Sequence, residues 1–281
     1  MRKFVYDPST ARIGLGTNIY REQEPLTGIL IEVVKHDYDF IDCAWRYGNE
    51  AIIGITIKAI KKENPSFEFT IPFQSKVWPT QFNGGIMKSL KFSLSKIGTS
   101  SIIDSYMLHR PIQEMKLNLI AWKQLIDCRK NRLTKQIGLG HFDKDLIEKL
   151  YENTGVRPQF LQIELSVNNM RWDRIHYCRE HDIDIQAYEP LGDYLSNSQN
   201  ATLISLAQKY NTTIKNLLLA YLLNQGITPV VTPETVEEIK EFPLAKNIIL
   251  EAEDIEVMNS INTYKNKHFE SLELDFREDI I

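Results

Sequence analysis

The sequence has few cysteines, and they do not suggest a disulfide framework. The three in 281 residues, an odd number at irregular spacing, are Cys43, Cys128 and Cys178. Small secreted domains pair many cysteines at short intervals instead. The first residues are also basic and are followed by Asp7 and Pro8, where a secretory signal would place an apolar stretch. We therefore expect a cytoplasmic protein with reduced thiols.

Long apolar runs and excess positive charge are absent as well. The longest apolar run extends only over residues 217–223, whereas a membrane-spanning helix needs about 20 apolar residues. The formal net charge is −4, so the chain has no basic field with which to attract the phosphates of a nucleic acid. We expect neither a membrane nor a nucleic acid as a partner, and a monomer or small homo-oligomer.

No linker, low-complexity tract or block of one charge divides the chain. Hydrophobic residues make up 43% and charged residues 25% of it, which is typical of a globular protein with a sizeable core. The length would allow two domains, but α/β barrels often run about 200 to 250 residues or more as one unit. We predict a single domain over residues 1–281, with a short tail from about residue 263 to 281.

Short apolar runs alternate with longer amphipathic stretches along the whole chain. This alternation is typical of βα units on a parallel sheet. Apolar residues recur at helical spacing in stretches such as 50–62, 117–130 and 143–152. Eight apolar runs predict the eight strands of a (β/α)8 TIM barrel, at residues 12–15, 40–43, 67–73, 102–108, 136–139, 160–164, 183–188 and 228–231.

The tetrapeptide Ile-Gly-Leu-Gly occurs twice, at residues 13–16 and 137–140. Neither copy has the third glycine of a dinucleotide-binding turn. We interpret both copies as small residues that pack within barrel strands.

Four polar residues lie at or just after the ends of predicted strands: Asp42, Tyr47, Lys76 and His109. The loops after barrel strands share one face, so we expect these side chains to converge. A tyrosine hydroxyl has a usual pKa of about 10 and protonates a carbonyl oxygen at neutral pH only when its anion is stabilised. A Lys76 ammonium would stabilise that anion, and Asp42 would hold the ammonium in place. Singly, such residues are more often packing groups, solvated charges or caps.

The segments that carry these residues resemble the aldo-keto reductase family. Residues 13–17 are similar to its first strand, residues 40–50 to the segment with its catalytic Asp and Tyr, and residues 75–78 and 108–111 to those with its Lys and His. The resemblance continues through 137–140, 162–164 and 187–192 and covers about residues 10 to 260. It implies a barrel in which Tyr47 is the general acid, His109 orients the substrate carbonyl, and a nicotinamide cofactor delivers hydride.

The resemblance also implies a cofactor site, but several of its positions are altered. Its residues would be Gly16, Thr17, Gly140, His141, Gln162, Tyr188, Glu189, Leu191, Glu234 and Glu238. A Ser-Asn pair of the family is replaced by Gly140 and His141, and a common Ser by Glu189, whereas Gln162 and the stacking Tyr188 are kept. The Lys and Arg that clamp the 2′-phosphate of NADPH are replaced by Glu234 and Glu238.

Carboxylates repel a phosphate but accept hydrogen bonds from ribose hydroxyls, so we expect NADH to be favoured over NADPH. Alternatively, Glu234 and Glu238 belong to a solvated acidic helix start capped by Thr232 or Thr235, and the protein uses no dinucleotide.

We predict an oxidoreductase that reduces an aldehyde or ketone, or oxidises the alcohol. A cofactor-independent lyase, dehydratase or isomerase and a non-catalytic binding protein are the alternatives. Trp45, Trp78 and Arg110, together with Arg46, are expected to line the pocket and to favour a small polar or anionic molecule. His141 and the cluster of His176, Cys178 and His181 match no common zinc spacing, so we expect no metal.

Overall fold

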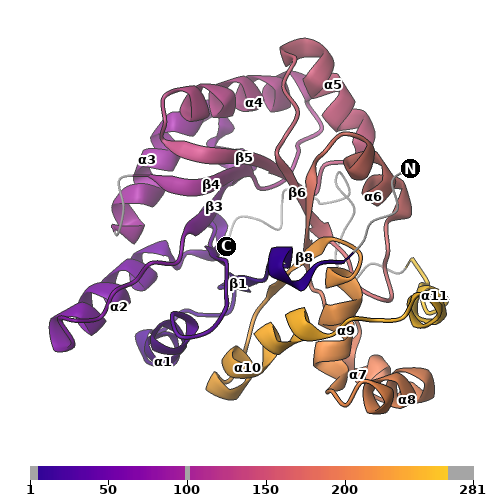
Figure 1. Cartoon of the computed structure of the whole chain (residues 1–281). Coiled ribbons are helices and arrows are strands. Elements are labelled where there is room, and N and C mark those ends of the chain that lie inside the picture. Colours follow the sequence, from indigo (N-terminus) through magenta and orange to yellow (C-terminus); the bar gives the residue numbers. More distant parts are fainter. Residues whose placement is uncertain (1–5, 99–101, 265–281) are drawn as a thin grey trace.

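Eight parallel strands form a closed barrel in the computed structural model, which describes residues 6–98 and 102–264 (Figure 1). Each strand pairs with the next along the chain, and β1 closes the barrel by pairing with β8. The strands are β1 (Gly14–Gly16), β2 (Phe40–Asp42), β3 (Phe73–Val77), β4 (Ile103–Leu108), β5 (Thr134–Gly140), β6 (Phe160–Glu164), β7 (Asp184–Tyr188) and β8 (Ile227–Val231). The predicted (β/α)8 fold is confirmed.

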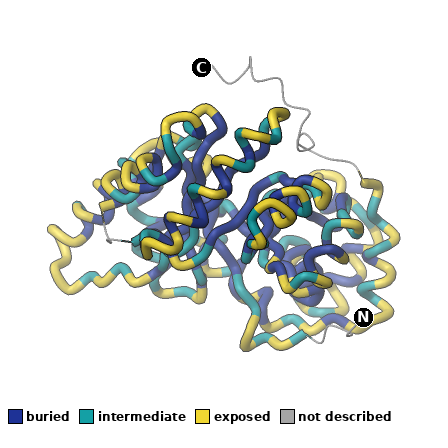
Figure 2. Tube along the Cα trace, turned by 90° about the horizontal axis from the view of Figure 1, so that it is seen from above, coloured by how far each residue is buried: buried dark blue, intermediate teal, exposed yellow. Residues whose placement is uncertain are grey.

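Helices surround the barrel, with buried faces inward and exposed faces outward (Figure 2). In α5, for example, the Asp143 side chain caps the first turn, Gly155 at φ 66° ends the helix, and Leu146, Ile147 and Leu150 are buried. The helices are α1 (Gln23–Val33), α2 (Glu50–Glu63), α3 (Ile86–Ile97), α4 (Met115–Lys130), α5 (Lys144–Thr154), α6 (Trp172–Glu180), α7 (Tyr194–Asn197), α8 (Ala201–Lys209), α9 (Ile214–Leu223), α10 (Val236–Glu241) and α11 (Ala252–Asn259). The helices predicted at 50–62, 117–130 and 143–152 are confirmed as α2, α4 and α5.

The predicted third strand, residues 67–73, is wrong. The barrel strand β3 is Phe73–Val77, and all five of its residues are buried although three of them are polar. Phe67 and Phe69 precede the strand and pack only partly against the core, with the Phe69 ring stacked on that of Phe73 at 5.5 Å. The prediction followed the aromatic residues. It missed the true strand because that strand carries polar side chains, which the barrel accommodates when they hydrogen-bond to neighbouring polar groups.

The two Ile-Gly-Leu-Gly copies allow close packing inside the barrel, as predicted. Gly14 is the register partner of Phe40, and a Cβ on Gly14 would lie 2.4 Å from that ring. Gly138 has the same relation to Phe160 in β6, also with a 2.4 Å contact. Each glycine thus makes room for a large ring on the neighbouring strand.

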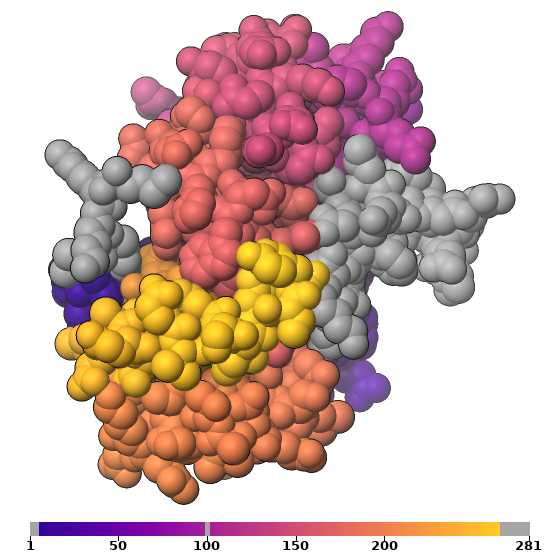
Figure 3. All heavy atoms as spheres, turned by 90° about the vertical axis from the view of Figure 1, so that its right-hand side faces the viewer, coloured from indigo at the N-terminus to yellow at the C-terminus, as the bar shows by residue number. Residues whose placement is uncertain are grey.

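The C-terminal segment that ends in α11 lies across the outside of the barrel (Figure 3). Asp254 of α11 binds the Lys209 ammonium at 2.7 Å, and Asn259 accepts a hydrogen bond from the Tyr221 hydroxyl at 2.7 Å. These contacts fix α11 to α8 and α9. The predicted tail is described only as far as residue 264; the rest of it lies outside the described residues.

At the end of the barrel where β1 and β2 begin, the buried Lys246 links its own segment to the residues that precede these strands. Its ammonium lies 2.9 Å from both Asp37 and Asp39, and Asp39 also accepts a hydrogen bond from the Ile13 amide before β1.

Across residues 6–98 and 102–264, no helix combines the length and apolarity that crossing a membrane requires.

Candidate active site

A cavity of about 820 Å³ opens at the carboxyl ends of the barrel strands. This size is within the range of ligand pockets, about 300 to 1,000 Å³. Its walls come from the ends of most strands, from α7, α9 and α10, and from the residue that follows α10. The lining residues are Gly16, Asn18, Ile19, Asp42, Arg46, Tyr47, Trp78, His109, Arg110, His141, Gln162, Tyr188, Glu189, Pro190, Leu191, Gly192, Tyr194, Lys215, Val230, Val231, Thr232, Glu234, Glu238 and Phe242.

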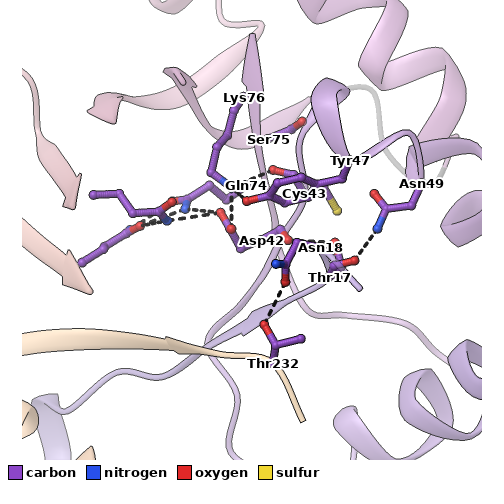
Figure 4. A network of polar contacts seen from close by, with 12 residues as sticks. Thr17, Asn18, Asp42, Cys43, Tyr47, Asn49, Gln74, Ser75, Lys76 and Thr232 are labelled. Atoms are coloured by element: carbon purple, nitrogen blue, oxygen red, sulfur yellow. Dashed lines mark hydrogen bonds and ion pairs between the residues drawn. The ribbon is translucent and has the colours of Figure 1, made fainter. Parts of the chain in front are cut away.

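The Lys76 ammonium is fully buried beneath this cavity and donates three hydrogen bonds. They go to the Asp42 carboxylate at 2.5 Å, the Cys43 carbonyl at 3.1 Å and the Tyr47 hydroxyl at 3.0 Å (Figure 4). An ammonium has three N–H groups, so all of them are used. The Tyr47 oxygen therefore accepts from Lys76, which leaves its own proton to be donated elsewhere.

A short turn after β2 places Tyr47 over Lys76. The 3₁₀ turn Trp45–Tyr47 is closed by Gly48 at φ 68°, a left-handed conformation that glycine adopts without strain. Thr17 donates its hydroxyl proton to the Asp42 carbonyl at 2.9 Å, and the Asn49 amide donates to the Thr17 carbonyl. The loops after β1 and β2 are thereby fixed to each other.

Three glutamines surround Asp42 in the barrel interior. Gln74 donates to the Asp42 carboxylate at 2.7 Å, and Gln162 does so at 3.4 Å. Both also donate to the Gln186 side chain, at 2.8 and 3.0 Å. Asp42 thus keeps its acceptor capacity filled and its orientation fixed.

Burial acts against the charged forms of both Lys76 and Tyr47. For Lys76 the nearby Asp42 and Tyr47 outweigh burial, and its pKa is raised above the usual value. For Tyr47 burial dominates and raises the pKa of the hydroxyl, although Lys76 acts in the opposite direction. Lys76 therefore acts on the Tyr47 pKa in the expected direction, but the net shift is upward, so Tyr47 stays protonated at neutral pH.

His109 is neutral in this site. Burial lowers its pKa well below the usual value, and Lys76, His141, Arg110 and Arg46 lower it further. Its ring meets the Tyr47 ring edge-on at 5.7 Å and the Trp78 ring at 4.9 Å. A neutral imidazole keeps one N–H group with which it can donate to a ligand beside the Tyr47 hydroxyl.

Two residues that follow strands have left-handed backbones. His141 has φ 61° and Glu189 has φ 52°, conformations that cost energy for residues with side chains and that cluster at functional sites. The His141 ring lies 5.0 Å from that of Tyr188, with Nδ1 3.4 Å from the Tyr188 hydroxyl. His141 therefore projects into the cavity between Tyr188 and His109, the ring of which is 6.3 Å away.

The two glutamates expected to face a phosphate have different environments. Glu238 pairs with the Lys215 ammonium from α9 and accepts a hydrogen bond from the Glu234 amide at 2.7 Å. Thr235 caps α10 by accepting from the Glu238 amide at 3.2 Å, so the capping interpretation is confirmed for Thr235. Glu238 is thus neutralised by Lys215, whereas Glu234 is exposed at the cavity mouth.

The structure brings most of the predicted site residues to one cavity. Four of them do not line its wall: Lys76 and Thr17 lie buried behind it, and Gly140 and Trp45 are also outside the lining. Gly140 packs within the barrel, because a Cβ there would lie 2.3 Å from the His109 carbonyl oxygen.

Sequence reasoning missed Lys215, Asn18, Tyr194 and Phe242. Lys215 lies on a helix that the sequence showed only as a buried apolar run, so no local signal connected it with Glu238.

The predicted His176 cluster lies on and just after α6, where His176 packs against Trp172 at 6.0 Å. Within the part of the chain that the structure describes, no three or more His, Cys, Asp or Glu residues are grouped to hold a metal ion.

Known proteins of one family resemble this chain over nearly its whole length. The model of the Aldo/keto reductase family matches residues 12–263. The NAD/NADP-dependent indole-3-acetaldehyde reductase of Schizosaccharomyces pombe is 26% identical in an alignment 267 residues long that covers 90% of this chain and 92% of that protein. An aldo-keto reductase enzyme from a Medee basin deep-sea metagenome library has a TM-score of 0.84 at 25% identity, covering 94% of this chain and 95% of that one. The Bombyx mori aldo-keto reductase in complex with NADP has a TM-score of 0.78 at 25% identity, covering 90% of both chains.

Proposed function

The chain belongs to the aldo/keto reductase family, and on that premise we propose that it reduces an aldehyde or ketone with a nicotinamide cofactor. The observation that carries the proposal is the set of three hydrogen bonds from the buried Lys76 ammonium to Asp42, the Cys43 carbonyl and Tyr47. Barrel stability does not require a charged lysine and a tyrosine hydroxyl in contact at that depth.

Tyr47 acts as the general acid in this proposal. Its oxygen accepts from Lys76, so its proton points to a carbonyl oxygen in the cavity, and the ammonium stabilises the phenolate that remains after transfer. Asp42 keeps Lys76 charged and in place, and neutral His109 donates a hydrogen bond that orients the carbonyl. A bound reduced nicotinamide would supply the hydride for the carbonyl carbon.

The cavity residues fit a dinucleotide and favour NADH. Tyr188 presents an aromatic ring at the end of β7, suited to stacking on a nicotinamide, and Glu234 can accept from ribose hydroxyls at the other end. Lys215 is the cation that lines that end, and Glu238 neutralises it. A 2′-phosphate would therefore meet a neutral pair and the negative Glu234, which opposes NADPH. The S. pombe relative is named for both NAD and NADP, and the B. mori structure contains NADP.

One observation favours the second candidate, a cofactor-independent lyase, dehydratase or isomerase. The His141 ring packs against Tyr188, beside the face on which a nicotinamide would stack. If His141 stays there, the cavity presents it beside Tyr47 as a second acid/base group, suited to proton transfer.

The test replaces Tyr47 by phenylalanine, which removes one hydroxyl and little volume. We expect carbonyl reduction, followed as NADH oxidation, to fall at least 100-fold, while the free energy of unfolding falls by no more than about 1 to 3 kcal/mol because Lys76 loses one hydrogen-bond acceptor. Tyr264→Phe, which alters an exposed hydroxyl, is the matched control. Activity within tenfold of the native protein, about 1.4 kcal/mol of barrier, would exclude Tyr47 as the proton donor. Turnover without any nicotinamide nucleotide that is lost in Tyr47→Phe and slowed in His141→Ala would instead select the second candidate.

A further inference from the structure

Two arginines flank the candidate catalytic residues. Arg46 directly precedes Tyr47 and Arg110 directly follows His109, and both line the cavity. Their guanidinium carbons lie 5.6 and 5.8 Å from the centroid of the same Trp78 ring. That ring is 4.9 Å from His109, so both cations are grouped around the substrate end of the cavity.

This grouping concentrates positive charge in a buried place. Arg110 is 1% and Trp78 7% exposed, so solvent screens the Arg110 charge poorly, whereas Arg46 is half-buried. The electron-rich face of the Trp78 ring attracts each guanidinium and holds it beside the cavity. A carboxylate in this part of the cavity would be attracted by both cations and could accept hydrogen bonds from the planar guanidinium groups.

The charges of the cavity are also distributed unevenly among the strands. The arginines belong to the ends of β2 and β4, whereas Glu189 and Glu234 follow β7 and β8 on another part of the wall. The charges on both parts of the wall act on the pKa values of the cavity residues. Burial is the largest cause of both shifts; Arg46 and Arg110 add to the lowering of the His109 pKa, whereas Glu164 and Glu189 add to the raising of the Tyr188 pKa, which Arg110 opposes.

We infer that the substrate is an aldehyde or ketone that carries a carboxylate, which Arg46 and Arg110 bind beside Trp78. This inference rests on the proposed reductase function and names the substrate class for it. The carbonyl would lie against Tyr47 and His109, and the carboxylate against the arginine that adjoins each of them in sequence. The two arginines determine specificity and take no part in proton transfer.

The first experiment compares each anionic carbonyl compound with its neutral methyl ester. Phenylglyoxylate carries the carboxylate next to the carbonyl, and 4-formylbenzoate carries it further away. We expect kcat/KM with NADH to be at least tenfold higher for one of these acids than for its ester. Arg46→Met should remove that preference mainly through KM, and Arg129→Met, an exposed arginine at the end of α4, should preserve it. Because Arg110 is buried and its variant can misfold, Arg46 carries the test.

Binding measurements separate this inference from the proposed function. In calorimetric titrations with and without NADH, benzoate should bind at least tenfold more tightly than benzamide, and Arg46→Met should abolish the difference. If the protein reduced none of the four carbonyl compounds but retained this benzoate preference, the anion site would stand and the reductase proposal would fail. Equal turnover of acids and esters, with no benzoate preference, would overturn the anion site alone. The anion site would also be overturned if Arg46→Met lost affinity for NADH but kept the preference for benzoate, because the arginines would then bind the cofactor pyrophosphate.

Discussion

Replacement of Glu238 by glutamine tests the electrostatic account of the nucleotide end. The native carboxylate pairs with Lys215 and accepts a hydrogen bond from the Glu234 amide. Glutamine keeps an acceptor oxygen for that amide but removes the negative charge. The Lys215 ammonium is then released to face a 2′-phosphate, so the variant should gain affinity for NADPH while NADH affinity stays nearly constant.

The size of this gain follows from the burial of the pair. The Lys215 side chain is 27% exposed and that of Glu238 15%, so the local dielectric lies between those of water and a protein interior. Two unit charges 4 Å apart attract by about 4 kcal/mol at an effective dielectric constant of 20. Greater separation and screening at the cavity mouth reduce this to about 1.4 to 2.8 kcal/mol. That range corresponds to about a tenfold to 100-fold change in the NADPH/NADH affinity ratio.

The assay is titration of both nucleotides by protein fluorescence, with kcat/KM for each as a second readout. Glu237→Gln is the matched control, since Glu237 is an exposed neighbour on the same first turn of α10 and does not line the cavity. A ratio that changes less than twofold in Glu238→Gln would show that Lys215 does not face the phosphate. An equal change in the control would assign the effect to net charge, and tight NADPH binding by the native protein would refute the proposed NADH preference.

Three other perturbations have defined outcomes. Burial raises the pKa of Glu50 despite the hydrogen bond from Ser75, so the Glu50 carboxyl stays protonated to higher pH in the folded protein than in the unfolded chain. The free energy of unfolding should therefore fall as pH rises above about 4. Urea titrations of Glu50→Gln should lack this pH-dependent fall. Lys246→Met should lower the free energy of unfolding in urea by about 1 to 3 kcal/mol, because the partly buried Asp39 then keeps only the Ile13 amide and the more distant Arg12 as partners. Asp37→Asn, at an exposed carboxylate, should cost less than about 1 kcal/mol. Lys76→Met should lower kcat about 100-fold or more and move the alkaline limb of the pH–rate profile for reduction to higher pH, because Lys76 opposes the rise in the Tyr47 pKa.

The barrel could be predicted because its signals are local. Alternating apolar runs and amphipathic helices lie in short windows of sequence, and the eight predicted runs overlap the eight barrel strands in order, the third of them only at Phe73. The misplaced strand, β3, has Gln74 and Lys76 bonded to Asp42 inside the barrel and Ser75 bonded to Glu50 of α2 on its outer side, so each of these polar groups pairs with a residue from a distant segment. A pattern rule that equates buried with apolar cannot detect such a strand.

The sequence by itself determined the fold, the convergence of Asp42, Tyr47 and His109 at the strand ends, and the presence of acids where a phosphate clamp would be basic. The tertiary structure alone decided how those groups are charged and paired. Glu238 is neutralised by Lys215, which is 23 positions earlier in the chain, and burial raises the Tyr47 pKa more than Lys76 lowers it. Burial, and the distances between residues far apart in sequence, set the pKa shifts and the strength of the ion pair. Neither quantity can be inferred from a local pattern of residues.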